Sequence, residues 1–365
     1  MTDEILPYYN RELSYIQDLA AEFAEQHPEE AAGLRISAGN IDDPHVERLI
    51  QAFALLCARI RFKLDDDFPE LTDSLLGHLY PHYLSPVPSM AIVQLAPAPE
   101  LDGYYTIPPK TEIETESIRG ENVSCRYRTC YPVVLRPIEV ASAALTGLPL
   151  DAPSNTDAVQ RDAIAVLRLT LACVGPNKSF KTLAKEWAKA PTSALRFFLR
   201  APRPLAFPLY ELLFNHTVSV AIGASSKDRN PVILEPKAVR PVGFEPDEGM
   251  VPYGPRSFIG YRLLTEYFTF PEKFLFFDLE GLTPEALAKG DKTLDIFFYL
   301  NRSDPDVEKR VDGKTFILGC TPIVNLFNQR AENISLTQTA YEYPVHPDRR
   351  KPRAYEIYSF DNVGA

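Results

Sequence analysis

Apolar residues recur every three or four positions along the first 80 residues, and this spacing places them on one side of a helix. The pattern predicts three amphipathic helices, at residues 8–26, 44–64 and 70–80. Asp43 and Pro44 suit the start of the second helix, and Pro81 ends the third. The stripe of the first helix comprises Leu13, Ile16, Leu19, Ala20 and Phe23. The stripe of the second comprises Val46, Leu49, Ile50, Phe53, Leu56, Cys57, Ile60 and Leu64.

From about residue 89 the pattern changes to short apolar or β-branched runs bounded by turn residues, such as "AIAVLRLTLACV" and "TVSVAIG". This pattern is typical of a sandwich or barrel of β-strands. One helix, "PLAFPLYELLFNH", is expected to interrupt the strands, and the polar stretch at residues 146–163 is expected to be a loop.

The last part of the chain mixes the two kinds of pattern. It predicts a helix at "SFIGYRLLTEYF", strands at "KFLFFDLEG" and "KTLDIFFYL", and a turn toward a helix at "LGCTPIVNLF". The expected fold class is therefore α+β, with a helical segment at residues 1–88, a β-rich domain at 89–255 and a mixed α+β domain at 256–365.

The composition describes a stiff, acidic chain with reduced thiols. Of 365 residues 33 are proline and only 17 are glycine, and the prolines lie between the β-like runs, where they act as punctuation of strands and turns. The net charge of −11 repels phosphate backbones, which argues against a nucleic-acid partner. The five cysteines show no tight pairs, as expected of a cytoplasmic protein. No apolar run is long enough to cross a bilayer, and the N-terminus lacks a secretory signal.

A search for chemistry returns no catalytic, cofactor or metal site. His78 and His82 flank Pro81 without a metalloprotease glutamate, and Cys125 and Cys130 have no second ligand pair in range. Glycine-rich phosphate loops and the serine-hydrolase elbow are also missing, so no small-molecule substrate is indicated. A basic cluster, formed by Arg349, Arg350, Lys351 and Arg353, is either a solvated loop or a contact for an acidic partner surface.

The helical stripes have a physical consequence. Leaving six or seven large apolar side chains in water forgoes on the order of 10 kcal/mol of burial free energy. Either the three helices close on one another, or helices of another subunit complete one of the stripes.

Several long strings make the chain recognisable: "LPYYNRELSYIQDLAAEFAEQHP", "DPHVERLIQAFALLCARIRFKLDDDFPELTDSLLGHLYPHYLSPVPSM", "GYRLLTEYFTFPEKFLFFDLEGL", "GCTPIVNLF" and "YPVHPDRRKPRAYEIYSFDNV". With these strings, in order along the whole chain, it resembles the TssF family, also called VasA or ImpG. Members of that family are baseplate subunits of the bacterial type VI secretion system. Relatives continue beyond "YSFDNV", so the resemblance implies an N-terminal portion of a longer protein.

The resemblance implies a structural role without catalysis. It implies that the chain assembles with TssG, a second TssF copy, TssE and TssK into a platform for the contractile sheath and inner tube. The platform is cytoplasmic and docks at the inner membrane through the secretion complex, with no direct membrane insertion. Phage-tail wedge proteins, which this family resembles, share a helical bundle between chains. The bundle contact is expected at Leu13, Ile16, Leu19 and Phe23, or at Leu49, Phe53, Leu56 and Ile60.

Two hypotheses that give the chain no role in an assembly have less support in the sequence. A β-rich carbohydrate-binding or glycoside-active protein would need two carboxylates at a fixed separation in an aromatic cleft, and no such pair is placed by the sequence. A peptide-binding adaptor that adds a strand to a sheet would need a long exposed edge strand.

Overall fold

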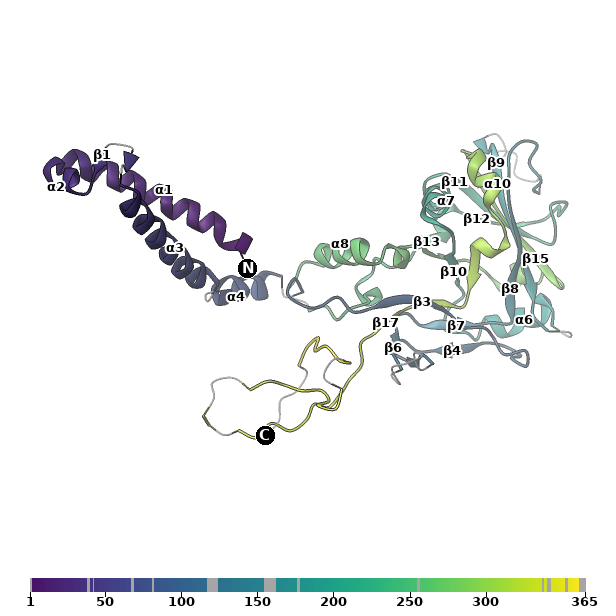
Figure 1. The fold of residues 1–365 in the computed structure, drawn as a ribbon. Coiled ribbons are helices and arrows are strands. Elements are labelled where there is room, and N and C mark those ends of the chain that lie inside the picture. The colour runs from purple at the N-terminus through teal and green to yellow at the C-terminus, as the bar shows by residue number, and fades with distance from the viewer. Residues whose placement is uncertain are drawn as a thin grey trace. The chain divides into compact units, whose positions relative to one another are not determined.

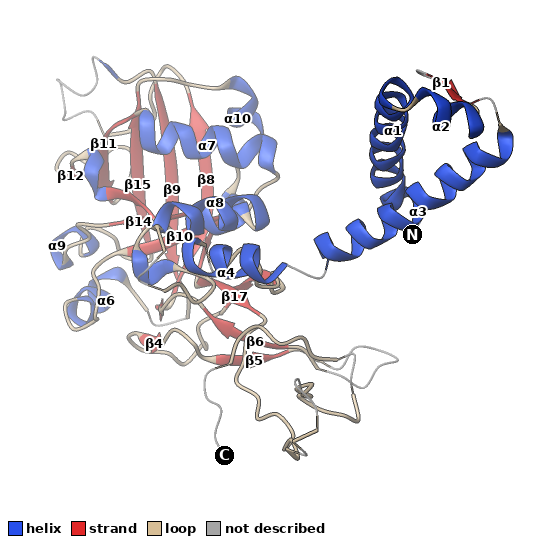
Figure 2. Cartoon of the chain, turned by 90° about the vertical axis from the view of Figure 1, so that its left-hand side faces the viewer, coloured by secondary structure: helices blue, strands red, loops and turns tan. Residues whose placement is uncertain are grey.

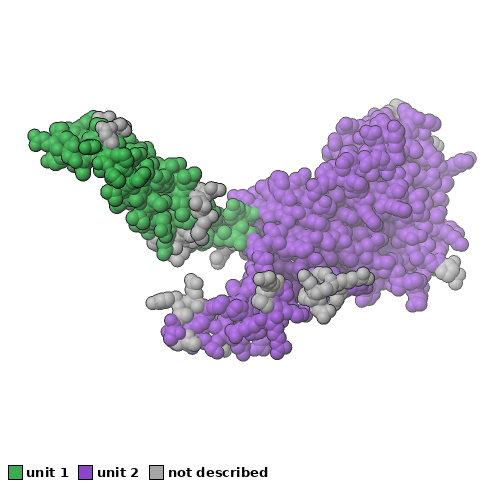
Figure 3. Space-filling view, in the orientation of Figure 1, with its two compact units in different colours: residues 1–84 green, residues 85–365 purple. Residues whose placement is uncertain are grey.

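The computed structural model describes residues 2–37, 40–41, 43–66, 69–80, 82–116, 124–153, 162–175, 178–254, 257–336, 338–339, 343–351 and 354–360. It divides into two compact units, residues 1–84 and 85–365 (Figure 3). The division falls four residues before the end of the helical segment that the sequence predicts.

Unit 1 is helical. Its elements are α1 (Thr2–Gln26), α2 (Pro28–Gly33), β1 (Ile36–Ser37), β2 (Asn40–Ile41), α3 (Pro44–Asp66) and α4 (Pro69–Leu79), shown in Figure 1. The three predicted helices are present, because the stripe spacing and the flanking prolines act locally. The short helix α2 and the β1-β2 pair were not predicted, and they occupy the link between the first two predicted helices.

Unit 2 is built on open antiparallel sheets (Figure 2). The five-stranded sheet has the order β12-β11-β15-β9-β8, with strands β12 (Val232–Leu234), β11 (Thr217–Gly223), β15 (Thr293–Leu300), β9 (Ala165–Cys173) and β8 (Ile138–Thr146). A four-stranded sheet has the order β13-β14-β10-β16, with strands β13 (Val239–Pro241), β14 (Phe276–Leu279), β10 (Leu195–Leu199) and β16 (Phe316–Leu318). The class is α+β, as predicted.

Two further sheets, one of four strands and one of two, complete the set that the structure describes. One has the order β3-β17-β6-β5, from β3 (Met90–Gln94), β17 (Cys320–Val324), β6 (Arg126–Thr129) and β5 (Glu112–Glu114). The other pairs β4 (Tyr105–Ile107) with β7 (Val133–Leu135). Every sheet described has two free edges, so these strands form no closed barrel.

Helices and turns complete unit 2. The α-helices are α6 (Phe180–Trp187), α7 (Arg203–Asn215), α8 (Ile259–Thr269), α9 (Pro284–Leu287) and α10 (Pro305–Arg310). The 3₁₀ turns are η1 (Pro236–Ala238), η2 (Pro246–Glu248), η3 (Pro271–Phe274) and η4 (Gly313–Thr315). Of the predicted loop at 146–163, residues 147–153 are irregular and 154–161 lie outside the described residues.

The predicted boundary at residue 255 is wrong, because strands from its two sides pair with each other. In the five-stranded sheet β15 lies between β9 and β11, and in the four-stranded sheet β14 lies between β10 and β13. The two sheets share one core, in which Phe277 of β14 meets Phe298 of β15 edge to face with ring centroids 6.5 Å apart. Removing residues 256–365 would take a central strand from both sheets.

The turn toward a helix that "LGCTPIVNLF" predicts is also wrong. Residues 320–324 form β17, whose five residues are all buried and pair with β3 more than 220 positions earlier in the chain. Pairing with a distant strand overrides the local pattern, since the strand buries both faces.

Two thiols, that of Cys320 in β17 and that of Cys130 beside it, make stability depend on pH. All five cysteines are free, and burial raises the pKa of Cys130 and of Cys320 from 9.0 to about 12. Between those values the unfolded chain releases a proton that the folded chain keeps, so stability falls as the pH rises above about 9. We expect Cys130→Ala to remove up to about 1.4 kcal/mol per pH unit of this loss. This pH dependence is measured by the urea unfolding midpoints of the wild type and of Cys130→Ala at pH 8, 9.5 and 10.5, with Cys125→Ala as the control. If the midpoints of the wild type and of Cys130→Ala fall equally with pH, the prediction is refuted.

Candidate partner interface

The helices α1 and α3 form an antiparallel hairpin. The ring of Tyr8 meets that of Phe62 edge to face at 5.6 Å, and Glu12 pairs with Arg61 at 3.4 Å. Ala54 and Ala58 are fully buried on the side of α3 that faces α1. Alanine allows the two helix backbones to approach closely, so this contact uses Ala54, Ala58 and Phe62 and leaves most large apolar residues of α3 outside it.

Most of the large apolar residues of α3 are exposed to solvent. Five side chains at spacings of three and four are 52–70% exposed: Leu49, Phe53, Leu56, Ile60 and Leu64. We call this set the α3 face. By helical geometry it lies well away from Ala54 and Ala58, so α3 is apolar on two sides and the hairpin covers only one.

The α1 stripe behaves differently. Leu13 and Ile16 are half-buried within unit 1, whereas Leu19 and Phe23 are 45% and 38% exposed. The predicted candidates on α1 are therefore partly used by the hairpin itself. The four candidates on α3 all belong to the exposed α3 face.

A further stripe on α4 was visible in the sequence but was not selected as a candidate. Leu71, Leu75 and Leu79, at steps of four, are 79%, 62% and 62% exposed. Their leucine periodicity was the available signal, and the sequence left open whether the stripes close on one another or are completed by another subunit. Within unit 1 these side chains are uncovered.

Charge flanks the α3 face. Arg48, Arg59 and Lys63 are exposed on the same helix, so a partner that covers the face meets an apolar stripe bordered by cations. Fully burying one large aliphatic or aromatic side chain is worth about 1.5–3 kcal/mol. Five side chains that are more than half exposed offer on the order of 5 kcal/mol to a partner helix.

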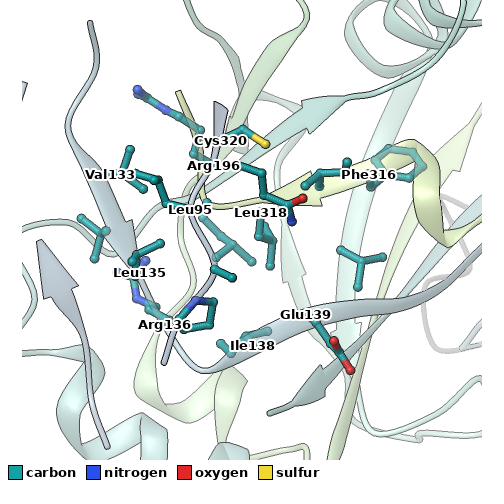
Figure 4. Close-up of a pocket in the computed structure, with 18 of the residues that line it drawn as sticks. Leu95, Val133, Leu135, Arg136, Ile138, Glu139, Arg196, Phe316, Leu318 and Cys320 are labelled. Carbon is teal, nitrogen blue, oxygen red and sulfur yellow. The ribbon is translucent and has the colours of Figure 1, made fainter. Parts of the chain in front are cut away.

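The main cavity of unit 2 does not resemble an active site. It has a volume of about 850 Å³ and is lined by all of β7 and β16, the end of β3 and the start of β8, among other segments (Figure 4). Three carboxylates line it. Asp278 accepts two hydrogen bonds of 2.8 Å from Arg196, and Asp312 accepts hydrogen bonds from the backbone amides of Lys314 and Thr315. Glu139 is the third carboxylate of the lining.

The buried cation of this cavity has a structural role. Arg136 stacks on Trp187 with its guanidinium 3.9 Å from the ring centroid, and it donates to the carbonyls of Thr192 and Ala194. Burial lowers the pKa of Arg136 to about 10. The side chain ties the β7-β8 connection to the loop before β10, and the cavity presents no pair of facing, unengaged carboxylates for glycoside chemistry.

Within the described residues, the histidine and cysteine motifs form no metal site. No group of three or more His, Cys, Asp or Glu side chains suited to a metal occurs among the described residues. In the same parts of the chain, none of the helices combines the length and the hydropathy that crossing a bilayer requires.

Of the basic cluster, Arg349 pairs with Glu332 at 3.2 Å, and Arg353 lies outside the described residues.

Comparison with known proteins gives consistent matches. The family model "Type VI secretion system, TssF" matches residues 1–365. Type VI secretion system component TssF1 of Pseudomonas aeruginosa is 35% identical over 369 residues, a match that covers 100% of this chain and 58% of that protein. A chain of the type VI secretion system TssK-TssF-TssG baseplate subcomplex, solved by cryo-electron microscopy, matches with a TM-score of 0.67 and 30% identity, covering 86% of this chain and 55% of that one. The chain thus spans a little over half the length of these relatives.

Proposed function

This chain belongs to the TssF family of the type VI secretion system, and from that membership we propose that it is a non-catalytic structural subunit of the baseplate. In this role it supports assembly of the contractile sheath and tube. The observation that carries the proposal is the α3 face, a helix side with five large apolar residues that unit 1 leaves uncovered.

The partners follow from the relatives. The similar solved chain belongs to a complex with TssK and TssG, which supports TssG and TssK as partners of this chain. We assign the α3 face to a helical bundle with TssG, because a stripe at spacings of three and four is complementary to another helix. TssE and a second TssF copy complete the proposed wedge.

The absence of catalysis is part of the proposal. Two of the three carboxylates in the main cavity are engaged by Arg196 and by backbone amides, so they are held as structural acceptors. The site of action is the cytoplasm, with attachment to the inner membrane through the secretion complex.

Co-expression with the TssG subunit of the same secretion system tests this function. We expect a stable hetero-oligomer whose mass, measured by light scattering or native mass spectrometry, equals a whole number of both chains. A folded chain that elutes alone, with TssG present and soluble, would contradict the proposal.

A further inference from the structure

Helix α8 has its polar and apolar sides reversed. Its two charged residues, Arg262 and Glu266, are 2% and 1% exposed, four positions apart on the inner side. The outer side carries Tyr261, Leu264, Tyr267 and Phe268, of which Phe268 is 80% exposed. An ordinary surface helix has the opposite arrangement, so the exposed apolar side of α8 is typical of a surface that binds a partner protein.

Buried charges hold α8 in this orientation. The Arg262 guanidinium donates to the carbonyls of Pro246 and Glu245, both at 2.8 Å. Glu266 accepts from the backbone amide of Met250 at 2.7 Å and from the fully buried ammonium of Lys273. Because these groups cannot turn outward without leaving unpaired charge inside, the helix cannot rotate to bury its aromatic side.

The exposed apolar residues lie on α8, directly before it, and on the loop that its Arg262 contacts. Six side chains, 43–80% exposed, make up this set: Phe244, Phe258, Tyr261, Leu264, Tyr267 and Phe268. We call it the α8 aromatic face. The buried ring of Phe274 lies beneath this face, with ring centroids 5.0 Å from Phe244 and 6.1 Å from Tyr267, and Phe268 lies 5.5 Å from Tyr267. Figures 1 and 2 show α8 outside the strand layers.

The size of the face fits one partner helix better than a second copy of the chain. Large aromatic side chains bury about 150–250 Å² each, so the five aromatic residues and Leu264 at these exposures offer on the order of 600 Å². A stable interface buries about 800 Å² on each partner. The face therefore falls short of a self-sufficient dimer contact, and it suits a helix that other contacts already hold nearby.

The border of the face is acidic. Glu245 and Asp247 are exposed on the loop to which Arg262 binds and supply the negative charge of the border. Glu272 lies on η3, after α8, and is paired with Arg203 at 3.3 Å. The exposed side of α8 itself carries no charge, since Arg262 and Glu266 are buried. An occupant with lysine or arginine beside its apolar stripe is complementary to this border.

We propose that the α8 aromatic face binds an amphipathic helix of a partner baseplate subunit, with basic residues beside the apolar stripe of that helix. The proposal rests on the structural role proposed above but uses a surface on unit 2, separate from the α3 face. Aromatic side chains at the centre of an interface contribute most of its binding free energy, so Phe268 and Tyr267 are the expected anchors.

Reconstitution with TssG and TssK of the same secretion system tests the proposal. The double variant Leu264→Glu/Phe268→Glu is expected to bind the partner subunits at least about 30-fold more weakly, the effect of losing one or more anchor side chains. Both residues are more than half exposed, so the variant is expected to match the wild type in circular dichroism and thermal unfolding. A photo-crosslinking phenylalanine at position 268 of the full chain is expected to label a partner helix that carries lysine or arginine beside its apolar positions.

Charge reversal supplies the matched control. Glu245→Lys/Asp247→Lys is expected to weaken binding and to reduce its dependence on salt, whereas Glu285→Lys, an exposed acid on α9, is expected to change neither. A wild-type chain that binds neither subunit would overturn the baseplate role and with it this proposal. A complex that forms equally with the Leu264→Glu/Phe268→Glu variant would overturn the α8 assignment alone. Crosslinks to a second copy, within the same chain, or to an acidic helix would also overturn it.

Discussion

Replacing Phe53 and Ile60 by aspartate is expected to abolish co-purification with TssG. Both side chains are about 60% exposed in unit 1, so the substitutions remove little packing within the described chain. In a bundle the same positions would be buried against a partner helix, where an unpaired carboxylate is strongly destabilising. We expect binding to fall by at least two orders of magnitude, measured by pull-down and by titration of TssG.

A matched control keeps this result specific. Ser14→Glu/Gln17→Glu adds the same number of negative charges to exposed positions of α1, outside the α3 face, and is expected to bind TssG normally. The thermal unfolding midpoint of the Phe53→Asp/Ile60→Asp variant should lie close to that of the wild type. Full binding by this variant would remove the α3 face from the proposed interface, and Leu19 and Phe23 on α1 would then be substituted in the same way.

Replacing Glu266 by glutamine is expected to destabilise unit 2 by about 3–5 kcal/mol. Glu266 is the carboxylate that faces two buried cations, Lys273 and Arg262, whose Nε lies 3.7 Å away. When this side chain is a neutral glutamine, both cations stay buried but no longer face a carboxylate there. Because small domains are stable by only about 5–15 kcal/mol, the shift should be large in urea unfolding curves.

Two further variants separate pairing from packing. Lys273→Met leaves Glu266 with Arg262 and the Met250 amide, so we expect a smaller loss, and the double variant should lose less than the sum of the single variants. Glu280→Gln breaks an exposed pair with Arg240 and is expected to cost less than about 1 kcal/mol. If Glu266→Gln changes stability no more than Glu280→Gln, the buried cluster does not hold α8.

Local patterns predicted the helices well, for reasons visible at particular residues. Pro44 starts α3, and α4 ends beside Pro81, because proline suits the first turn of a helix and cannot continue one. Helix α6 was missed, although Ser179 and Thr182 form a capping box at its start, because its eight residues are too few for a clear period.

Local patterns could not predict which strands pair with each other when the strands lie far apart in the sequence. The strand at residues 293–300 was predicted as a strand, but nothing near it in sequence indicates that it lies between β9 and β11. The predicted domain boundary at 255 failed for this reason. A strand's partners depend on the free energy of the whole sheet, and its own composition does not encode them.

The candidate interface, too, was determined in part by the sequence and in part by the tertiary structure. The amino-acid sequence alone determined that α3 carries a long apolar stripe, since periodicity is a property of neighbouring residues. Only the tertiary structure decided that Ala54 and Ala58 pack on α1 while Leu49, Phe53, Leu56 and Ile60 stay in water. On α8 it decided that Arg262 and Glu266 face inward, because carbonyls of residues 244–246, the Met250 amide and the Lys273 ammonium meet them there. Which side of a helix is buried depends on what the rest of the chain brings to it.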